Sequence, residues 1–230
     1  MVIFNALGGD DLYRGVELDE DVSGGEGNDW ISGMGGNDHL MGNEGDDTLR
    51  GDAGRNWLEG DQGKDTFQAG NEGLQILRDF NPADDQIEIA AAGVKGLGDL
   101  KISTILWNPN NEKKGYASGR TNEKALYITW GSQKAPQNGS FVKPSDLTGT
   151  GIVVQGSSDF AAVRNQIKIL PRLAKPVMDF THSVWTPDLP ANVDPADLAP
   201  GLDPKRLVND TEGPQTAADL DLPDTSGYYV

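Results

Sequence analysis

The sequence predicts an all-β fold built on a parallel solenoid, and three observations support this prediction. Residues 24–68 consist of consecutive nine-residue blocks whose period never slips. Residues 100–170 contain short runs rich in β-branched residues, separated by glycine and asparagine clusters. Residues 171–230 are acidic and rich in proline. We therefore expect repeats over residues 1–73, a small antiparallel β capping region that continues their core over residues 74–170, and an extended tail over residues 171–230.

The blocks share glycine at the first and fourth places, Asp or Asn at the sixth and an apolar residue at the eighth. They read GGEGNDWIS, GMGGNDHLM, GNEGDDTLR, GDAGRNWLE and GDQGKDTFQ. Because glycine takes positive φ without a Cβ clash, glycines at places one and four allow the first six residues to form a tight turn. The last three residues then form a very short strand with one apolar side chain pointing inward.

The turn of each block is rich in oxygen donors, which indicates a site for a hard cation. Turn carbonyls can point at one centre, and the sixth-place carboxylate adds a charged oxygen. Two stacked turns can supply the roughly six to eight oxygen ligands that Ca²⁺ accepts at about 2.3–2.6 Å. The absence of cysteine and of clustered histidine argues against zinc or copper. The residues predicted to form several calcium sites are Asp11, Asp29, Asp38, Asp47, Asn56, Asp65, Gly24, Gly27, Gly33, Gly36, Gly42, Gly45, Gly60 and Gly63.

These blocks resemble the RTX nonapeptide, G-G-x-G-x-D-x-U-x, of hemolysin-type calcium-binding proteins. The resemblance is strong over residues 24–68, and degraded copies at residues 6–14 and 15–23 extend it almost to Met1. It implies a right-handed parallel β-roll in which one coil takes two nonapeptides. Each ion then lies between turns of successive coils, so blocks eighteen residues apart stack.

This stacking implies two rows of sixth-place residues. The first row is Asp11, Asp29, Asp47 and Asp65. The second row is Glu20, Asp38 and Asn56. We expect weaker or missing calcium sites in the second row, because Asn56 has no charge and Arg55 places a cation beside it.

Charge and composition exclude several classes of protein. Residues 1–70 contain 16 acidic and 4 basic side chains, and the whole chain has a formal net charge of −17. Nucleic-acid binding is not expected, since phosphate contacts need Lys and Arg. No apolar run approaches the roughly 20 residues of a membrane span. Stacked carboxylates should repel one another until cations enter.

Residues 74–89, LQILRDFNPADDQIEI, resemble the segment that closes many RTX rolls. In physical terms, such a segment covers the last coil with larger side chains. Its turn at Asn81–Asp85 has two interpretations, an extra calcium site or a solvated acidic turn. We expect strands at KISTILW, ALYITWG, GIVVQG and NQIKIL, and a helical turn at Asp159–Arg164.

Trp107 and Trp130 end two of these strands and also have two interpretations. Exposed tryptophans of this kind can form a carbohydrate-binding platform. Buried ones belong to the core or to the edge of the sheet, which is the commoner case.

The tail contains nine of the 13 prolines, with single large apolar residues among acidic ones. This composition predicts an extended segment in isolation. It suits an arm anchored on another protein subunit, or an acidic C-terminal export signal. No cleaved secretory leader precedes the repeats if Met1 is the native start, which agrees with type I export to the extracellular space or cell surface, as for RTX proteins. A cytosolic or virion protein would also lack a leader.

No catalytic motif appears in the sequence. H-E-x-x-H, G-x-S-x-G and G-x-x-x-x-G-K-[ST] are all missing. We expect a non-enzymatic, calcium-dependent structural or adhesive subunit of an extracellular or surface assembly. The alternatives are a virion component with a strapping tail and a secretion or targeting module of an exported enzyme, such as a sugar-modifying one.

Overall fold

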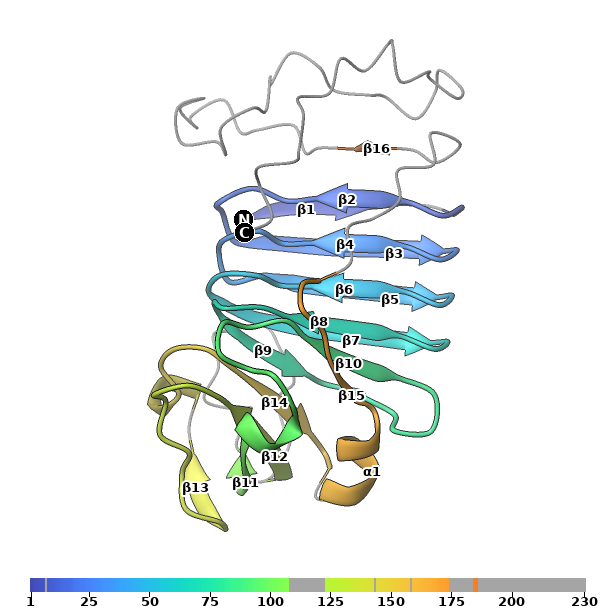
Figure 1. Cartoon of the computed structure of the whole chain (residues 1–230). Helices are drawn as coiled ribbons and strands as arrows, with labels where there is room; N and C mark the ends of the chain where they lie inside the picture. The colour runs from blue at the N-terminus through green and yellow to red at the C-terminus, as the bar shows by residue number, and fades with distance from the viewer. Residues whose placement is uncertain (7, 108–122, 143, 158, 174–183, 186–230) are drawn as a thin grey trace.

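The computed structural model describes residues 1–6, 8–107, 123–142, 144–157, 159–173 and 184–185, which form an almost entirely β structure (Figure 1). The chain winds between two sheets in stacked coils. The nine-stranded sheet has the order β1 (Val2–Asn5), β3 (Glu20–Glu26), β5 (His39–Glu44), β7 (Arg55–Gln62), β9 (Leu74–Leu77), β14 (Gly151–Gln155), β12 (Glu123–Thr129), β11 (Lys101–Trp107), β13 (Ser140–Val142). The seven-stranded sheet has the order β15 (Ile167–Ile169), β10 (Gln86–Ile89), β8 (Thr66–Ala69), β6 (Thr48–Arg50), β4 (Trp30–Ser32), β2 (Leu12–Arg14), β16 (Val184–Trp185).

Parallel pairing confirms that one coil takes two nonapeptides. In the nine-stranded sheet Val22 pairs with Leu40, and Leu40 pairs with Leu58. In the other sheet Ile31 pairs with Leu49. Each pair is separated by eighteen residues, as the resemblance implied. The parallel β-roll predicted for the repeats is therefore confirmed, and its coils include both degraded copies.

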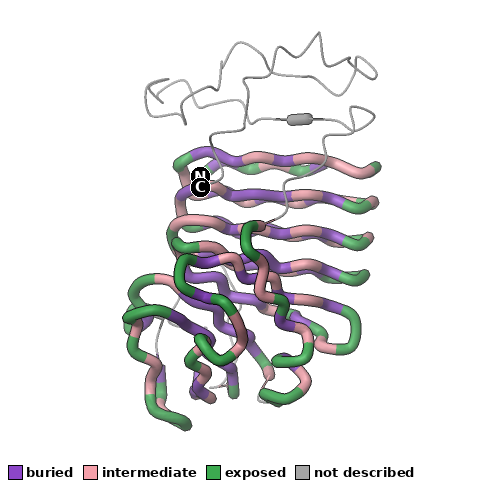
Figure 2. Tube along the Cα trace, viewed as in Figure 1, coloured by how far each residue is buried: buried purple, intermediate pink, exposed green. Residues whose placement is uncertain are grey.

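The eighth-place residues form the core of the roll. Each is at most 1% exposed, and they are Tyr13, Val22, Ile31, Leu40, Leu49, Leu58 and Phe67. One inward side chain per strand is enough because stacked coils bury it from above and below. Figure 2 shows the result, with buried positions along the strands and exposed positions at the turns.

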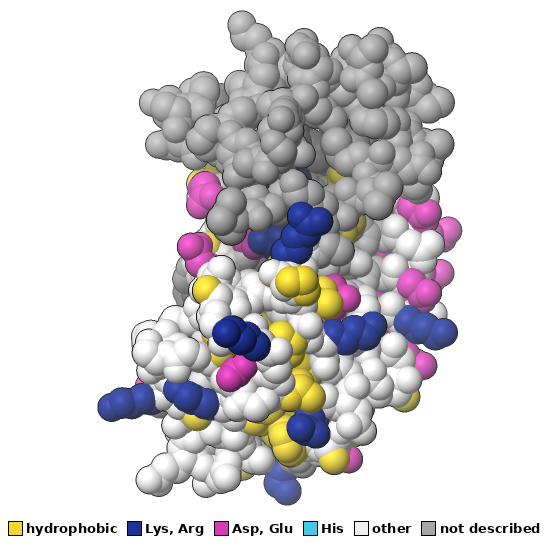
Figure 3. Space-filling view, in the orientation of Figure 1, with side chains coloured by type: hydrophobic (Ala, Val, Ile, Leu, Met, Phe, Trp, Pro, Cys, Tyr) yellow, Lys and Arg dark blue, Asp and Glu magenta, His cyan; other side chains and the backbone are white. Residues whose placement is uncertain are grey.

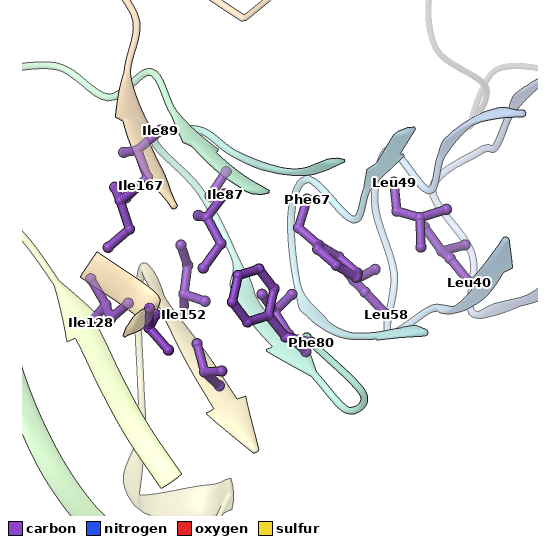
Figure 4. Close-up of a cluster of buried hydrophobic side chains, with 14 of the residues drawn as sticks. Leu40, Leu49, Leu58, Phe67, Phe80, Ile87, Ile89, Ile128, Ile152 and Ile167 are labelled. Atoms are coloured by element: carbon purple, nitrogen blue, oxygen red, sulfur yellow. The ribbon is translucent and has the colours of Figure 1, made fainter. Parts of the chain in front are cut away.

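Residues 74–89 form a further coil instead of a lid across the end of the roll. β9 pairs with β7, and β10 pairs with β8. Phe80 lies between these strands and packs edge-on against Phe67, with 5.9 Å between ring centroids (Figure 4). The end of the roll, which this segment was predicted to cover, is instead covered by the later strands β14 and β15.

The predicted antiparallel capping region is confirmed, and it extends the roll's own nine-stranded sheet. β14 pairs with β9 in parallel, while β12 pairs with both β14 and β11 in antiparallel fashion. In the other sheet β15 pairs with β10. The expected helical turn is α1 (Phe160–Asn165), where the Asp159 side chain accepts hydrogen bonds from the N–H groups of Ala161 and Ala162. Two 3₁₀ turns, η1 (Leu97–Asp99) and η3 (Pro144–Asp146), are the other elements outside the strands in the described part of the chain.

Trp107 and Trp130 are 0% and 5% exposed, so the carbohydrate-platform interpretation is wrong for both of them. Trp107 belongs to a second core on the opposite face of the nine-stranded sheet, together with Ile76 and Tyr127. Trp57, at an outward place of the roll, packs against this second core. No helix in the described part of the chain is long and apolar enough to cross a membrane.

The predicted tail is described at its start, residues 171–173, and at β16. β16 pairs in parallel with β2 of the same chain, placing Val184 beside Leu12 and Trp185 beside Tyr13. The seven-stranded sheet thus continues beyond the first coil. The rest of the predicted tail, residues 174–183 and 186–230, lies outside the described residues.

Candidate metal centre

The backbone of each repeat turn departs from the expected glycine pattern at the first place. First-place glycines such as Gly24 and Gly42 do not have positive φ. They are needed for space instead, because a Cβ on Gly24 would overlap Oδ2 of Asp29, and one on Gly42 would overlap Oδ2 of Asp47. Positive φ occurs at the second place, where the residues are Gly25 (109°), Met34 (66°), Asn43 (79°), Asp52 (58°) and Asp61 (64°).

The fourth-place glycines have positive φ, as predicted, and they also allow a close approach between coils. Gly27, Gly45 and Gly63 have φ values of 126°, 138° and 143°. A Cβ on Gly45 would overlap the carbonyl oxygen of Gly27, and one on Gly63 would overlap that of Gly45. Turns of successive coils therefore stack backbone on backbone, which brings their carbonyl groups into register.

The first row binds its coils together through carboxylates. Asp11 N–H donates to Oδ1 of Asp29 at 2.8 Å, and Asp29 N–H donates to Oδ1 of Asp47 at 2.7 Å. Asp47 N–H donates to Oδ1 of Asp65 at 3.0 Å. The row continues to Asp85, whose Oδ1 accepts from Asp65 N–H at 3.0 Å. Asp85 was not predicted as a row member, because the extra residues of the last coil place it 20 positions after Asp65.

In two side chains of the first row, the second carboxylate oxygen has no protein partner. Oδ2 of Asp29 and Oδ2 of Asp47 are both buried without a hydrogen bond. Leaving a buried charged oxygen unpaired is costly, so the folded state favours protonation unless a cation is present. Accordingly, burial raises the pKa of Asp29, of Asp47 and of Asp65 to about 7 in each case. Hard oxygens arranged in this way fit Ca²⁺.

The second row has the same plan but loses its charge along the roll. Glu20 N–H donates to Oδ1 of Asp38 at 3.1 Å, and Asp38 N–H donates to Oδ1 of Asn56 at 2.9 Å. Burial raises the pKa of Asp38 to about 9 and that of Glu20 to about 8. Oε2 of Glu20 and Oδ2 of Asp38 are buried without a hydrogen bond. Next along the row come two amides, Asn56 and Gln75.

Fifth-place residues form another set of links that sequence reasoning missed. Asn28 N–H donates to Oδ1 of Asp10 at 2.7 Å, and Asp46 N–H donates to Oδ1 of Asn28 at 2.8 Å. These bonds run in the opposite direction to those of the sixth place, so each turn holds the coils on both sides. The signal was present in the sequence, because Asp or Asn occupies the fifth place until Arg55 and Lys64 end the pattern.

Among the described residues, no group of three or more His, Cys, Asp or Glu side chains is placed to hold a metal ion. A cation between the coils would therefore need main-chain carbonyls as well as carboxylates. Figure 3 shows acidic side chains along both edges where the coils turn.

Residues 14–49 and 41–72 match the model of the RTX calcium-binding nonapeptide repeat, in four copies. Residues 14–72 therefore consist of RTX calcium-binding repeats, and several Ca²⁺ ions are the cofactor of this part of the chain. No curated protein matches the chain.

Two solved structures from Azotobacter vinelandii are similar to the chain. The solution structure of the AlgE6R2 subunit of mannuronan C5-epimerase is 24% identical, with 72% of this chain and 96% of that chain covered and a TM-score of 0.43. The solution structure of the AlgE6R3 subunit is also 24% identical, with 69% and 78% covered and a TM-score of 0.26.

Proposed function

We propose that this chain is a non-enzymatic, calcium-dependent structural or adhesive subunit of an assembly outside the cell. The observation that carries the proposal is the first row, whose buried carboxylates leave oxygens without protein partners. RTX repeats are typical of secreted proteins, which supports an extracellular place of action. The absence of known catalytic motifs from the sequence agrees with a non-enzymatic role.

The calcium ions of the first row would lie between successive coils. Asp11, Asp29, Asp47 and Asp65 would supply carboxylate oxygens, and Asp85 extends the set. Gly24, Gly42 and Gly60 would act by leaving room for the carboxylates, and Gly27, Gly45 and Gly63 by letting the turns stack. In the second row, Asp38 with Gly33 and Gly36 would form the equivalent site, and the turn of Asn56 would form a weaker site or none.

Calcium binding at these places couples directly to folding. The ion supplies positive charge where the folded chain has gathered acidic oxygens, and the unfolded chain offers no such site. An ion present at 100 times its dissociation constant adds about 2.7 kcal/mol of stability. A few sites therefore equal the roughly 5–15 kcal/mol of a typical domain. At neutral pH, the acidic coils of the roll would stay unfolded where calcium is scarce and fold where it is abundant.

A calcium titration of the full chain tests the proposal. Circular dichroism should show a gain of β signal on adding calcium and its loss on adding EDTA, and calorimetry should count several ions. Magnesium is the control, since it demands a smaller octahedral site and gives up water reluctantly. An unchanged spectrum and melting temperature in EDTA would contradict the proposal.

We further propose that the tail, residues 171–230, contacts another molecule. Its single apolar residues among prolines and acidic residues are too sparse for a core of their own. Deleting residues 172–230 should leave the roll folded in calcium while export or assembly fails. Failure of export supports a signal, and failure of assembly supports a strap. Unfolding of the roll in saturating calcium would contradict both, and would give the pairing of β16 with β2 a structural role.

A further inference from the structure

At the turn Asp52–Asn56, the last in the second row, side-chain amides donate hydrogen bonds to the carbonyl oxygens of the turn. Nδ2 of Asn56 lies 3.3 Å from the carbonyl oxygen of Asp52 and 3.4 Å from that of Ala53, and donates to both. Nε2 of Gln75, from the next coil, donates to the same Asp52 oxygen at 2.8 Å. Nδ2 of Asn56 also donates to Oε1 of Gln75 at 3.4 Å. Both side chains are buried, so this small network is shielded from solvent.

The amide nitrogen of Asn56 occupies the place of the unpaired carboxylate oxygen in the other turns. Oδ1 of Asn56 accepts from Asp38 N–H, as Oδ1 of Asp47 accepts from Asp29 N–H. A Cβ on Gly51 would overlap the Asn56 side chain, as a Cβ on Gly42 would overlap that of Asp47. The two turns thus share one plan. Where Asp47 presents an unpaired oxygen, Asn56 presents a hydrogen-bond donor.

We propose that the amides of Asn56 and Gln75 replace a calcium ion in this turn, so that it closes without metal. A cation between turns draws carbonyl oxygens together, and here the donating N–H groups of two amides do the same. The amides bring no net charge, so they add no repulsion that a counterion must cancel. This inference rests on the proposed function, since it assigns the replaced ion to the calcium sites described above.

The position of this turn gives the replacement a role, because it lies where the roll joins the capping region. Leu74 N–H donates to the carbonyl oxygen of Gly54 at 2.7 Å, and Gly151 N–H donates to that of Gly73 at 3.1 Å. Gly151, the first residue of β14, pairs with Leu74 of β9. The amide-closed turn therefore keeps β7 and β9 attached to β14 when calcium is absent. The metal-dependent coils then have a fixed end on which to fold.

Hydrogen exchange on the full chain, with calcium and with EDTA, tests this role. In EDTA, peptides from β3 and β5 should lose at least about tenfold more protection than peptides from β9 and β14, because local stabilities differ across a structure. Equal loss in β9 and β3 would overturn the inference while leaving the proposed function intact. If the chain binds no calcium, the proposed function fails as well.

The variant Asn56→Asp tests the replacement itself by restoring a carboxylate. It should bind an additional calcium ion, and β9 should become calcium-dependent in hydrogen exchange. Asn37→Asp is the matched control, because it adds the same charge at a fifth place, where Asp10 and Asp46 already occur. The control should change neither result. An Asn56→Asp protein that binds no additional ion, whether folded in calcium or not, overturns the inference.

Discussion

The roll and the capping region belong to the same nine-stranded sheet but are held together differently. In the roll, every neighbouring pair of strands is parallel, and each strand contributes one eighth-place side chain to a narrow core. In the capping region, the antiparallel pairs β11–β12 and β12–β14 contribute side chains to cores on both faces of the sheet. Apolar burial therefore supports the cap from two sides and the roll from one.

The roll and the capping region also differ in the charged side chains that they bury. The roll buries the carboxylates Glu20, Asp29, Asp38, Asp47 and Asp65, each at most 2% exposed. A region with a thin core and buried carboxylates needs an external source of stability, and in the proposed function calcium would supply it. The capping region, with apolar cores on both faces of the sheet, does not need such a source. The proposed calcium dependence would thus be confined to one end of a continuous sheet, where the core is thinner and the acidic side chains are buried.

The largest expected effect comes from blocking the stacking of the coils. Gly45→Ala places a Cβ onto the carbonyl oxygen of Gly27, at a φ of 138°. The combined overlap and strain should cost on the order of 4 kcal/mol or more and prevent the roll from folding in calcium. Circular dichroism in calcium measures it. Gly98→Ala is the control, since a Cβ there meets nothing within 4 Å. A Gly45→Ala protein with parental stability would show that close stacking is not required.

Core truncations should separate the two regions next. Leu49 and Val153 are both 0% exposed, in the roll and in the cap respectively. Leu49→Ala should destabilise by about 2–5 kcal/mol, the usual cost of such a cavity, and should shift the calcium-folding midpoint upward. Val153→Ala should lower the melting temperature in calcium and in EDTA alike. If Leu49→Ala also weakened the cap in EDTA, the two regions would form one cooperative unit.

A smaller effect is expected from single ligand changes in the two rows. Asp47→Ala removes a carboxylate whose two neighbours along the first row are Asp29 and Asp65. Asn56→Ala removes an uncharged amide. Calorimetry should therefore find that Asp47→Ala binds fewer calcium ions than the parent protein. Asn56→Ala should bind as many ions as the parent protein but be less stable. Equal losses of bound calcium would contradict the proposed division between the rows.

The smallest effect concerns pH and is confined to the calcium-free state. The pKa values of Asp29, Asp47 and Asp65 are raised to about 7 by burial, from about 4 in the unfolded chain. The folded roll thus holds protons that the unfolded chain releases. The associated stability is full below about pH 4 and is lost as the pH rises through about 7.

In EDTA, the roll should therefore melt at a higher temperature at pH 5 than at pH 8. In saturating calcium this difference should shrink or reverse, because protons and calcium compete for the same oxygens. Thermal melts at both pH values, with and without EDTA, measure the effect. Melting that rises from pH 5 to pH 8 in EDTA would mean that the carboxylates are already stabilised without metal.

The sequence by itself determined the roll. A nine-residue period with glycine, an acidic residue and one apolar residue at set places predicts tight turns, inward side chains and cation chemistry, because each follows from local geometry. The coil length of two nonapeptides came from the resemblance to the RTX repeat. The burial of Leu40 and Leu58 confirms the inward places, and their pairing confirms the coil length. Even the degraded copy at residues 6–14 followed the period, and its Tyr13 lies in the core.

Only the tertiary structure decided the features that depend on contacts between coils and with the cap. First-place glycines such as Gly24 are required by space and not by φ, because a Cβ would overlap the carbonyl oxygen of Gly42 in the next coil as well as Asp29 of the same turn. Asp85 joins the first row at an irregular spacing, and Gln75 meets Asn56 only after β9 has stacked on β7. β14 likewise reaches β9 across a long stretch of chain. Such contacts depend on how distant segments pack together, whereas the conformation of a short repeat depends on the residues within it.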